Sequence, residues 1–168
     1  MYSIGDYIVY GTKGVCKVTE IGSLAMPDVA SDRLYYTLEL VYNHGGKVFT
    51  PVDNTKVLMR PILTEKEAVE LVEQVESLLP IEITDEKHRE DTYREIIHSC
   101  DCSELIRFIK MLNIRNKTRI AEGKKITSGD DRYLHMAEDN LYSELSLSLS
   151  IPKEAVRAFV FKTELATE

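Results

Sequence analysis

The chain has 168 residues, of which 43% are hydrophobic and 29% are charged, and its formal net charge is −7 at pH 7. This composition is typical of a globular protein and excludes an intrinsically disordered chain. The length allows one domain or two small ones. Because the sequence contains no long apolar run and no basic-then-apolar N-terminus, we expect neither a membrane span nor a secretory signal.

The cysteine count and the charge narrow the classes of protein further. Three cysteines without framework spacing point to a reducing compartment, so we expect a cytoplasmic location. The net negative charge argues against a free-standing nucleic-acid binder, because neutralisation of phosphates supplies most of the affinity of such proteins. The charge is unevenly distributed: residues 1–62 hold six basic and six acidic side chains, whereas the remainder holds 15 basic and 22 acidic ones.

The N-terminal stretch IGDYIVYGTKGVCKV (4–18) reads as a strand, a short turn and a second strand. β-Branched and aromatic residues fill both arms, and Gly11 and Gly14 supply the backbone freedom that a tight turn needs. The connection is too short for a helical crossover between parallel strands. The stretch therefore predicts the beginning of a small antiparallel sheet or barrel.

The strand pattern continues to about residue 60. Residues 33–42 (RLYYTLELVY) alternate between two faces, as a half-buried strand does. The turn NHGG (43–46) leads to a returning strand, KVFTPV (47–52), and DNT (53–55) turns the chain again. Pro51 has no N–H to donate, so we expect its strand to lie at a sheet edge or to end there. Four or five such strands suggest an SH3-like or Tudor-like barrel.

The pattern changes to a helical one after Pro61. Thr64, followed by Glu67, forms a capping box ahead of apolar residues at helical spacing. The predicted helices cover residues 64–79, 85–99, 103–122, 127–150 and 151–165. We therefore predict an α+β protein with a small N-terminal Tudor/SH3-like β domain (1–62) and a C-terminal five-helix bundle (63–168).

The sequence offers little catalytic chemistry. It contains no phosphate-binding glycine loop, no nucleophile elbow and no HExxH motif. The one local cluster of potential metal ligands is His98, Cys100 and Cys102, but structural zinc sites need four ligands. We interpret the cluster as an inter-helix connection in which Asp101 or Ser103 caps the next helix. We predict no enzyme, cofactor, metal or small-molecule substrate; a metal-dependent enzyme is the weakest hypothesis.

Residues 105–126 form a basic segment inside an acidic domain, with seven basic side chains and only Glu122 as an acid. At helical spacing, Leu105, Ile109, Leu112 and Ile120 share one side, with basic residues largely opposite. One interpretation is a solvated surface face. The other interpretation is that the basic side chains contact DNA phosphates, which fixes the position of the protein without reading the base sequence. The residues proposed for such contact are Arg115, Lys117, Arg119, Lys124 and Lys125.

Taken in order, five stretches resemble the CarD/CdnL family of bacterial transcription regulators. The opening IGDYIVYGTKGVCKVTEI is similar to the family's first signature, and YYTLEL followed by VFTPVDN is similar to its next strands. REDTYREIIHSCD resembles a helix that family members end with Ser-Gly-Asp. ITSGDDRYLHMAEDNLYSELS resembles their Leu-Ser-x-Gly-Glu-Arg helix. The ordered set spans nearly the whole chain.

The resemblance implies a Tudor-like domain that docks on the RNA polymerase β subunit. It also implies a helical domain that contacts promoter DNA near the upstream edge of the melted bubble and changes open-complex stability. Docking by an exposed strand uses main-chain hydrogen bonds for affinity. The expected docking residues, with Phe49 as the best single candidate, are Leu24, Met26, Lys47, Val48, Phe49, Thr50 and Pro51. For Phe49, an ordinary role in the barrel is the alternative.

One departure from the family bears on the DNA role. Family members carry a Trp near the start of the second C-terminal helix, used as a wedge against the minor groove. This chain has no Trp, and the corresponding position is Glu86. Its carboxylate is repelled by DNA phosphates. Arg89 and the basic segment are still expected to hold DNA weakly once docking raises its effective concentration.

These observations support a non-enzymatic regulator that docks on RNA polymerase and contacts promoter DNA without sequence preference. The rival hypothesis is a polymerase-docking adaptor whose acidic helical domain binds another protein. Glu86 and the net charge favour the rival, whereas the basic segment favours DNA. The sequence does not indicate which promoters respond, the direction of the effect or the oligomeric state.

Overall fold

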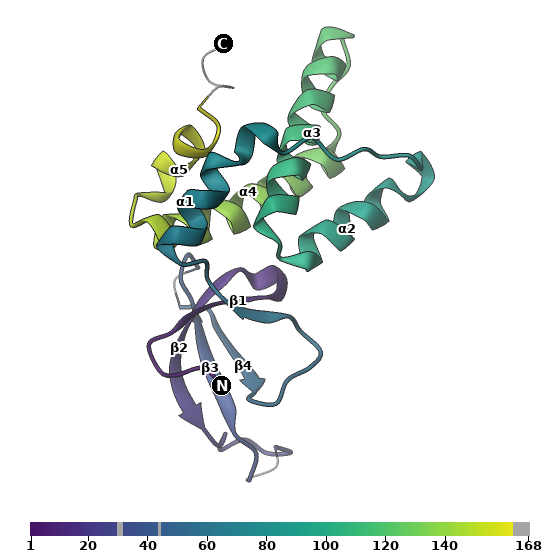
Figure 1. The fold of residues 1–168 in the computed structure, drawn as a ribbon. Coiled ribbons are helices and arrows are strands. Elements are labelled where there is room, and N and C mark those ends of the chain that lie inside the picture. Colours follow the sequence, from purple (N-terminus) through teal and green to yellow (C-terminus); the bar gives the residue numbers. More distant parts are fainter. Residues whose placement is uncertain (30–31, 44, 163–168) are drawn as a thin grey trace. The chain divides into compact units, whose positions relative to one another are not determined.

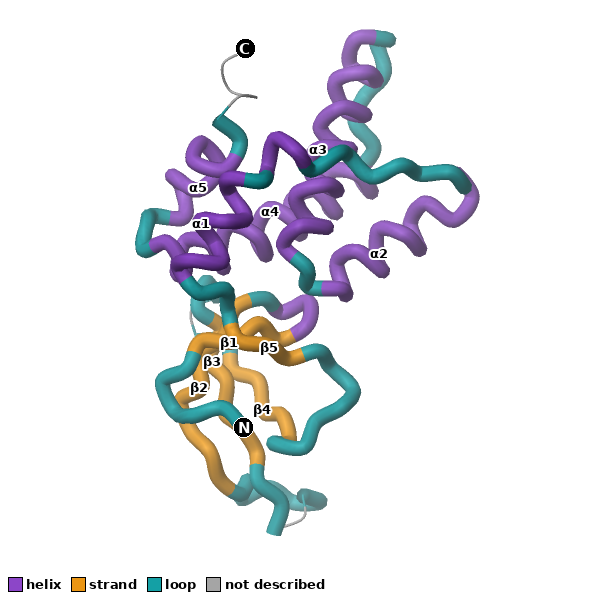
Figure 2. The backbone as a smooth tube through the Cα atoms, viewed as in Figure 1, coloured by secondary structure: helices purple, strands orange, loops and turns teal. Residues whose placement is uncertain are grey.

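A computed structural model describes residues 1–29, 32–43 and 45–162. It confirms the predicted α+β class: strands fill the N-terminal part and helices the C-terminal part (Figures 1 and 2). The chain divides into two compact units, Met1–Ile62 and Leu63–Glu168.

The N-terminal unit is built on a five-stranded antiparallel sheet. The strands are β1 (Tyr7–Tyr10), β2 (Val15–Gly22), β3 (Tyr35–Leu40), β4 (Lys47–Pro51) and β5 (Met59–Pro61). Their order in the sheet is β4-β3-β2-β1-β5, which leaves β4 and β5 at the two edges. Pro51 thus ends an edge strand, where its missing N–H costs the sheet nothing.

The first turn depends on glycine, as its sequence predicts. A single 3-10 turn (Gly11–Lys13) joins β1 to β2, and Gly11 and Gly14 have φ values of 46° and 78°. A side chain at Gly11 would also meet Val57, because an added Cβ would lie 2.7 Å from Cγ1 of that valine. Both the backbone conformation and the close packing therefore require glycine at position 11.

Alternation along β3 decides which face of the sheet is covered. Tyr36 and Leu38 are at most 1% exposed and pack with Ile8, Cys16 and Val18 in the core of this unit. The side chains at odd positions of β3 lie on the opposite face. Residues of β4 paired with β3 follow the same alternation, which positions the candidate docking side chains described below.

The described residues of the C-terminal unit, 63–162, form five α-helices. They are α1 (Glu65–Glu73), α2 (Arg89–Ser99), α3 (Cys102–Ala121), α4 (Ser128–Leu149) and α5 (Lys153–Val160). The capping box at Thr64 is confirmed: its side chain accepts from the N–H of Glu67, whose carboxylate accepts from the N–H of Thr64. Asp101 rather than Ser103 caps α3, and Thr127 caps α4.

Three helix ends differ from the sequence-based expectation. The first helix, α1, ends at Glu73 rather than at residue 79, and a 3-10 turn, η2 (Val75–Ser77), follows it. The second helix begins with a 3-10 turn, η3 (Glu86–His88), before α2 proper, because Asp85 caps that turn through the N–H of Lys87. The last helix, α5, ends at Val160 rather than near residue 165. Residues 163–165 of that predicted helix lie outside the described part of the chain.

The helices pack around α3 and α4, which supply the most buried side chains of this unit. Ile106, Phe108, Leu112, Leu141 and Leu145 are fully buried. The C-terminal turns of α3 and the start of α4 project beyond the other helices (Figure 1).

Burial along α3 follows the predicted apolar stripe only in its first part. Leu105, Ile109 and Leu112 are buried, as predicted, but Ile120 is 59% exposed. It lies in the projecting part of α3, where fewer helices are available to cover it. None of the helices in the described ranges is long and apolar enough to cross a membrane.

Candidate binding surfaces

The first candidate surface is the outer edge of β4. The N–H of Leu40 donates to the carbonyl of Gly46, and the N–H of Val52 donates to the carbonyl of Leu34. In an antiparallel ladder, hydrogen-bonded and non-hydrogen-bonded residue pairs alternate. Since Leu40/Gly46 and Leu34/Val52 are hydrogen-bonded pairs, every second residue from Gly46 to Val52 directs its N–H and C=O toward β3. The N–H and C=O groups of Lys47 and Phe49 therefore face away from β3. No strand in the described part of the chain pairs with this outer edge.

The side chains of β4 divide between two faces. Thr50 is 1% exposed and Val48 is half-buried against the core, because their partners in the register are the buried Tyr36 and Leu38. Lys47 and Phe49 lie on the other face, where Phe49 remains 43% exposed. Of the predicted docking residues on β4, Thr50 is thus an interior residue whose side chain is closed to a partner. Lys47, Phe49 and Pro51 are accessible.

The other predicted docking residues follow β2. The sheet register aligns Gly22, Tyr35 and Pro51 at one end of the sheet. Leu24 and Met26 begin the β2–β3 connection at that same end, where Leu24 is half-buried and Met26 is 51% exposed. The structure thus brings these two residues to the end of β4 that carries Pro51.

A cation lies next to this end of the sheet. The guanidinium of Arg33 bonds to the carboxylate of Asp53 at 3.0 Å and lies 5.9 Å from the ring centre of Tyr35. Tyr35 shares the outer face with Phe49, since the register pairs Tyr35 with Pro51 and Thr37 with Phe49. This face therefore offers aromatic and apolar surface beside unpaired main-chain groups, which suits strand addition.

The second candidate surface, the predicted DNA-binding set, is only partly available. Arg89, at the start of α2, is turned inward, with a side chain 15% exposed. Its guanidinium donates to the Glu86 carboxylate at 2.9 Å and to the Tyr93 hydroxyl at 3.0 Å. Glu86 is 69% exposed, and the hydrogen bond from Arg89 lowers the pKa of its carboxyl. The exposed acid Glu86 thus binds the neighbouring arginine.

Arg115 is likewise engaged within the fold. Its Nε donates to the Asp130 carboxylate at 2.6 Å, and Asp130 is 3% exposed. Tyr93 also donates to that carboxylate at 2.9 Å. Burial raises the pKa of Asp130, but the hydrogen bonds from Arg115 and Tyr93 outweigh it and hold the pKa below its ordinary value of 3.8. Burial, with the bond to Asp130, raises the pKa of Tyr93 to about 12.

Two further basic side chains of α3 bind main-chain carbonyls. The ammonium of Lys110 donates to the carbonyl of Val75 at 2.5 Å and to that of Leu78 at 2.8 Å. These carbonyls belong to the 3-10 turn η2 (Val75–Ser77) that follows α1 and to the residue after it. Arg107 donates to the carbonyl of Leu79 at 2.9 Å. Cations near a helix C-terminus stabilise its unpaired carbonyls, so these two residues support the fold.

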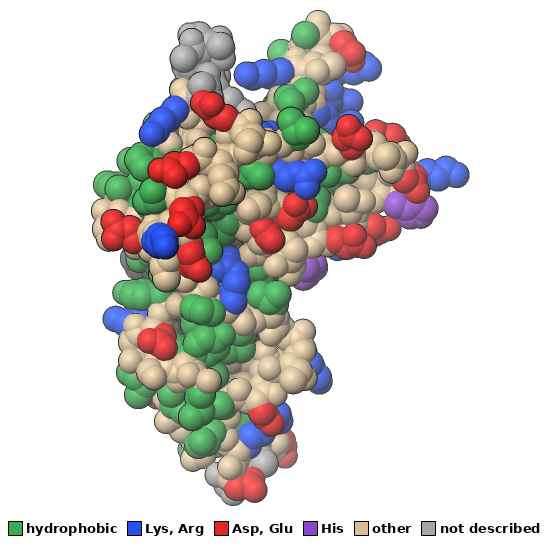
Figure 3. All heavy atoms as spheres, in the orientation of Figure 1, with side chains coloured by type: hydrophobic (Ala, Val, Ile, Leu, Met, Phe, Trp, Pro, Cys, Tyr) green, Lys and Arg blue, Asp and Glu red, His purple; other side chains and the backbone are tan. Residues whose placement is uncertain are grey.

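The basic end of α3, which we define as residues 116–126 and which includes the turn after Ala121, holds the remaining cations. Arg119 donates to the carbonyl of Lys125 at 2.9 Å, and Lys124 lies 3.1 Å from the carboxylate of Glu122. Lys117 and Lys125 are exposed, and neither side chain forms an ion pair within the described ranges. Lys and Arg side chains gather around this projecting end on the face drawn in Figure 3.

The side chains of the histidine–cysteine cluster have partners within the fold. The Nδ1 atom of His98 lies 2.8 Å from the carbonyl of Arg94, and the ring is exposed. Cys100 and Cys102 are buried, and the thiol of Cys102 donates to the carboxylate of Glu144 at 3.2 Å. Across residues 1–29, 32–43 and 45–162, no three His, Cys, Asp or Glu side chains are placed to hold a metal ion.

Sequence reasoning missed the buried network around Asp130. A local signal existed, because Asp130 lies three residues after the N-cap Thr127, whose hydroxyl accepts from the N–H of Asp130 at 3.1 Å. That spacing predicts a carboxylate in the first turn of α4. It does not indicate that the carboxylate binds Tyr93 and Arg115, which are 37 and 15 residues away in the chain.

Comparison with known proteins bears on the N-terminal unit. Residues 2–63 match the family model of the CarD-like/TRCF RID domain. This range contains the whole five-stranded sheet and both of its edges. No curated protein matches the chain.

Proposed function

Because residues 2–63 belong to the CarD-like/TRCF RID domain family, an RNA polymerase-interacting family, we propose that this chain regulates transcription by docking on the polymerase β subunit. A domain of this family is a protein-interaction module rather than a catalytic one. The outer edge of β4 is the docking surface in this proposal, and residues 63–168 form a second functional domain that contacts promoter DNA.

The observation that carries the docking proposal is the unpaired edge of β4. Lys47 and Phe49 direct main-chain groups outward, and Phe49 adds an exposed ring beside them. A partner strand added there would gain backbone hydrogen bonds from the edge and apolar contact from Phe49. Pro51 offers a carbonyl but no N–H, so it limits the length of the added ladder.

The DNA part of the proposal rests on the basic end of α3. Lys117, Lys124 and Lys125 are exposed on a projecting end, where phosphates have access to them. Three cations supply weak, salt-dependent binding without sequence preference. Such contact becomes useful after docking, because the polymerase holds the DNA close and raises its effective concentration. In this proposal, the contact changes the stability of the open promoter complex.

The experiment is the lifetime of promoter complexes formed by purified polymerase. We compare no added protein, the wild-type chain and a Lys117→Glu/Lys124→Glu/Lys125→Glu variant. The matched control is Lys13→Glu/Lys56→Glu/Lys66→Glu, which changes the net charge equally at exposed lysines elsewhere. A β-subunit pull-down establishes that all three proteins dock.

We expect the wild type and the control variant to change the lifetime and the first variant to dock without changing it. If all three proteins dock and none changes the lifetime, the DNA contact is wrong and the docking proposal stands. If the wild type fails to dock, the whole proposal is wrong.

One observation favours the rival hypothesis, in which the helical unit binds another protein. Four of the seven basic side chains in residues 105–126 donate to groups within the fold: Arg107, Lys110, Arg115 and Arg119. The local excess of positive charge is therefore smaller at the surface than in the sequence. An unchanged promoter-complex lifetime in the experiment above would favour this rival.

A further inference from the structure

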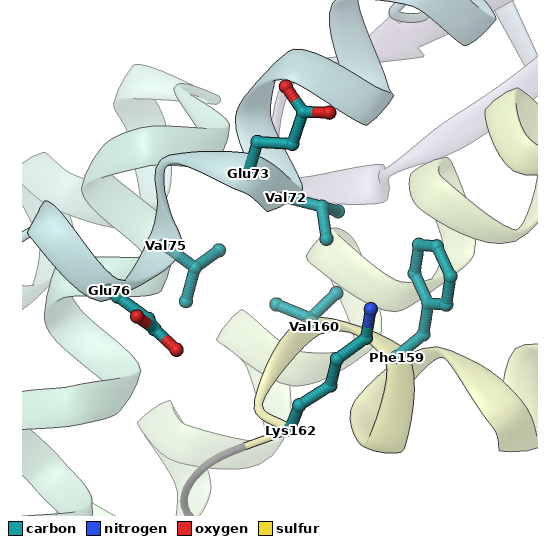
Figure 4. A pocket seen from close by; sticks show the side chains of 7 residues that line it. All are labelled: Val72, Glu73, Val75, Glu76, Phe159, Val160 and Lys162. Atoms are coloured by element: carbon teal, nitrogen blue, oxygen red, sulfur yellow. The ribbon is translucent and has the colours of Figure 1, made fainter.

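The helical unit carries a groove between α1 and α5 that no part of the proposed function uses. Its volume is about 280 Å³, and Val72, Val75, Phe159 and Val160 line it together with Glu73, Glu76 and Lys162, whose ammonium lies between Val160 and Phe159 (Figure 4). We call it the α1–α5 groove. Its volume is smaller than the roughly 300–1,000 Å³ that is usual for small-molecule sites. A groove of this size suits individual side chains of a protein segment.

The groove has an apolar floor. Val75 and Val160 are each 4% exposed, and Val72 and Phe159 are half-buried beside them. In Figure 4 these four side chains point toward a common space, whereas the carboxylate of Glu73 points away from it. An apolar side chain entering this space would contact valines from two different elements, α1–η2 on one side and α5 on the other.

The α1 side of the groove is held in place from behind. α1 ends at Glu73, and the chain continues through the 3-10 turn that contains Val75. Lys110 of α3 fixes this turn through its bonds to the carbonyls of Val75 and Leu78. The groove is therefore preformed, and a ligand would bind without first ordering that wall.

Charge identifies the kind of ligand. Glu73 and Glu76 are exposed at the margin, and neither forms an ion pair within the described ranges. Glu73 ends α1 and Glu76 lies in the 3-10 turn η2, so the two carboxylates leave the same wall in different directions (Figure 4). Of the glutamates of α1 and the turn after it, these two line the groove, where they outnumber the single cation Lys162. This wall suits a ligand with basic side chains beside its apolar ones.

The opposite wall supplies one cation. Lys162 lies over the ring of Phe159, with its ammonium 4.8 Å from the ring centre. It thereby covers part of the apolar surface of α5, and it forms no ion pair with Glu73 or Glu76 within the described ranges. The C-terminal residues that follow, with the sequence TELATE, carry two glutamates and no cation. Their charge disfavours them as the occupant beside Glu73 and Glu76.

We propose that the α1–α5 groove binds an amphipathic protein segment whose apolar side chains are flanked by lysine or arginine. The apolar side chains fill the space between Val72, Val75 and Val160. The cations of the segment pair with Glu73 and Glu76. This mode is helix-in-groove recognition, and it is independent of the docking edge and of DNA.

The test is a titration of the full chain, labelled at its valine methyl groups, with a synthetic helical peptide. The peptide carries leucines at helical spacing with lysines between them. Two matched peptides replace the lysines by glutamates or the leucines by serines. We expect the methyl signals of Val72, Val75 and Val160 to shift with the first peptide and to stay unchanged with the other two.

Variants locate the binding. Glu73→Lys/Glu76→Lys should lower the affinity for the peptide at least tenfold at low salt, and Val72→Ser should lower this affinity severalfold. The matched control Glu82→Lys/Glu95→Lys makes the same charge change at exposed sites outside the groove. It should lower the affinity for the peptide less than threefold. Equal loss in the control would mean that only net charge attracts the peptide, and the proposal would be wrong.

Two other occupants would also overturn the proposal. If a chain ending at Lys162 binds the peptide more than tenfold tighter than the full chain, the C-terminal segment competes for the groove. If the groove methyl signals shift with protein concentration alone, a second copy of the chain is the occupant. No shift of these signals with the lysine peptide at millimolar concentration would exclude the proposed ligand class.

Discussion

The two candidate surfaces of this chain are built in opposite ways. At the edge of β4, topology makes the surface: a strand with one neighbour leaves every second set of main-chain groups unpaired, whatever its side chains are. Along α3, the surface was expected from side-chain charge, and the fold uses much of that charge itself. Arg115 binds Asp130, and Lys110 binds two carbonyls. Charge counted along a sequence is therefore not charge available to a ligand.

The largest effect should come from the buried partner of Arg115. Asp130→Asn should lower the free energy of unfolding by about 3 kcal/mol at pH 7, because breaking one side of a buried ion pair leaves the other uncompensated. Urea unfolding measures it. Such a loss would establish that Arg115 stabilises the fold. A loss below about 0.5 kcal/mol would contradict that assignment and return Arg115 to the DNA-binding set.

The pH dependence of the same variant has a defined sign. The pKa of Asp130 is lower in the folded chain than its ordinary value of 3.8. The ionised Asp130 therefore stabilises the fold fully at pH values well above 3.8. This stabilisation is lost as the pH falls below 3.8 and through the pKa of the folded state. The difference in unfolding free energy between the wild type and Asp130→Asn should shrink as the pH falls from about 5 to 3.

Two lysines of α3 provide the next comparison. Lys110→Met should lower the free energy of unfolding by about 1–2 kcal/mol, since it removes a charged donor from two carbonyls in a partly exposed setting. Lys117→Met should change the unfolding midpoint little, because Lys117 is exposed. Parallel urea titrations test the pair. Equal effects would contradict the division of α3 into structural and available cations.

The smallest effect concerns Glu86. Glu86→Gln removes the carboxylate that pairs with Arg89 and should raise the affinity of the helical unit for duplex DNA by up to about threefold, an effect that salt weakens. The unfolding midpoint should stay unchanged, since Glu86 is exposed. Fluorescence anisotropy at two salt concentrations measures the affinity. An unchanged affinity would mean that Tyr93 alone suffices to hold Arg89 away from DNA.

Local signals were sufficient for much of the fold. Thr64 with Glu67 predicted the start of α1, and Gly11 with Gly14 predicted the first turn, because these motifs act over three or four residues. The strand alternation in residues 33–42 predicted the buried face of β3, although the strand itself is shorter, Tyr35–Leu40. The α+β class follows from such local patterns.

The partners of the charged side chains were beyond sequence reasoning. Lys110 contacts carbonyls 32 and 35 residues away in the chain, and no pattern of residue types announces a bond to a carbonyl. Ile120 continued an apolar stripe by its spacing, yet it lies on the projecting end of α3 and is exposed. Helical spacing identifies a face of a helix but not the length over which neighbouring helices cover it.

The most direct test of the docking account compares two substitutions of Phe49. Phe49→Ala removes the ring and keeps the N–H, whereas Phe49→Pro also removes an N–H that faces away from β3. Both should fold, because proline is tolerated where an edge strand directs its N–H outward. Circular dichroism and urea unfolding confirm this before affinities for the polymerase β subunit are compared.

We predict that Phe49→Ala weakens binding to the β subunit about tenfold, as loss of an aromatic anchor does. Phe49→Pro should weaken it a further five- to tenfold, since one hydrogen bond contributes about 1 kcal/mol. Equal affinities for the two folded variants would contradict the account, because the outward N–H of residue 49 would then play no part in docking.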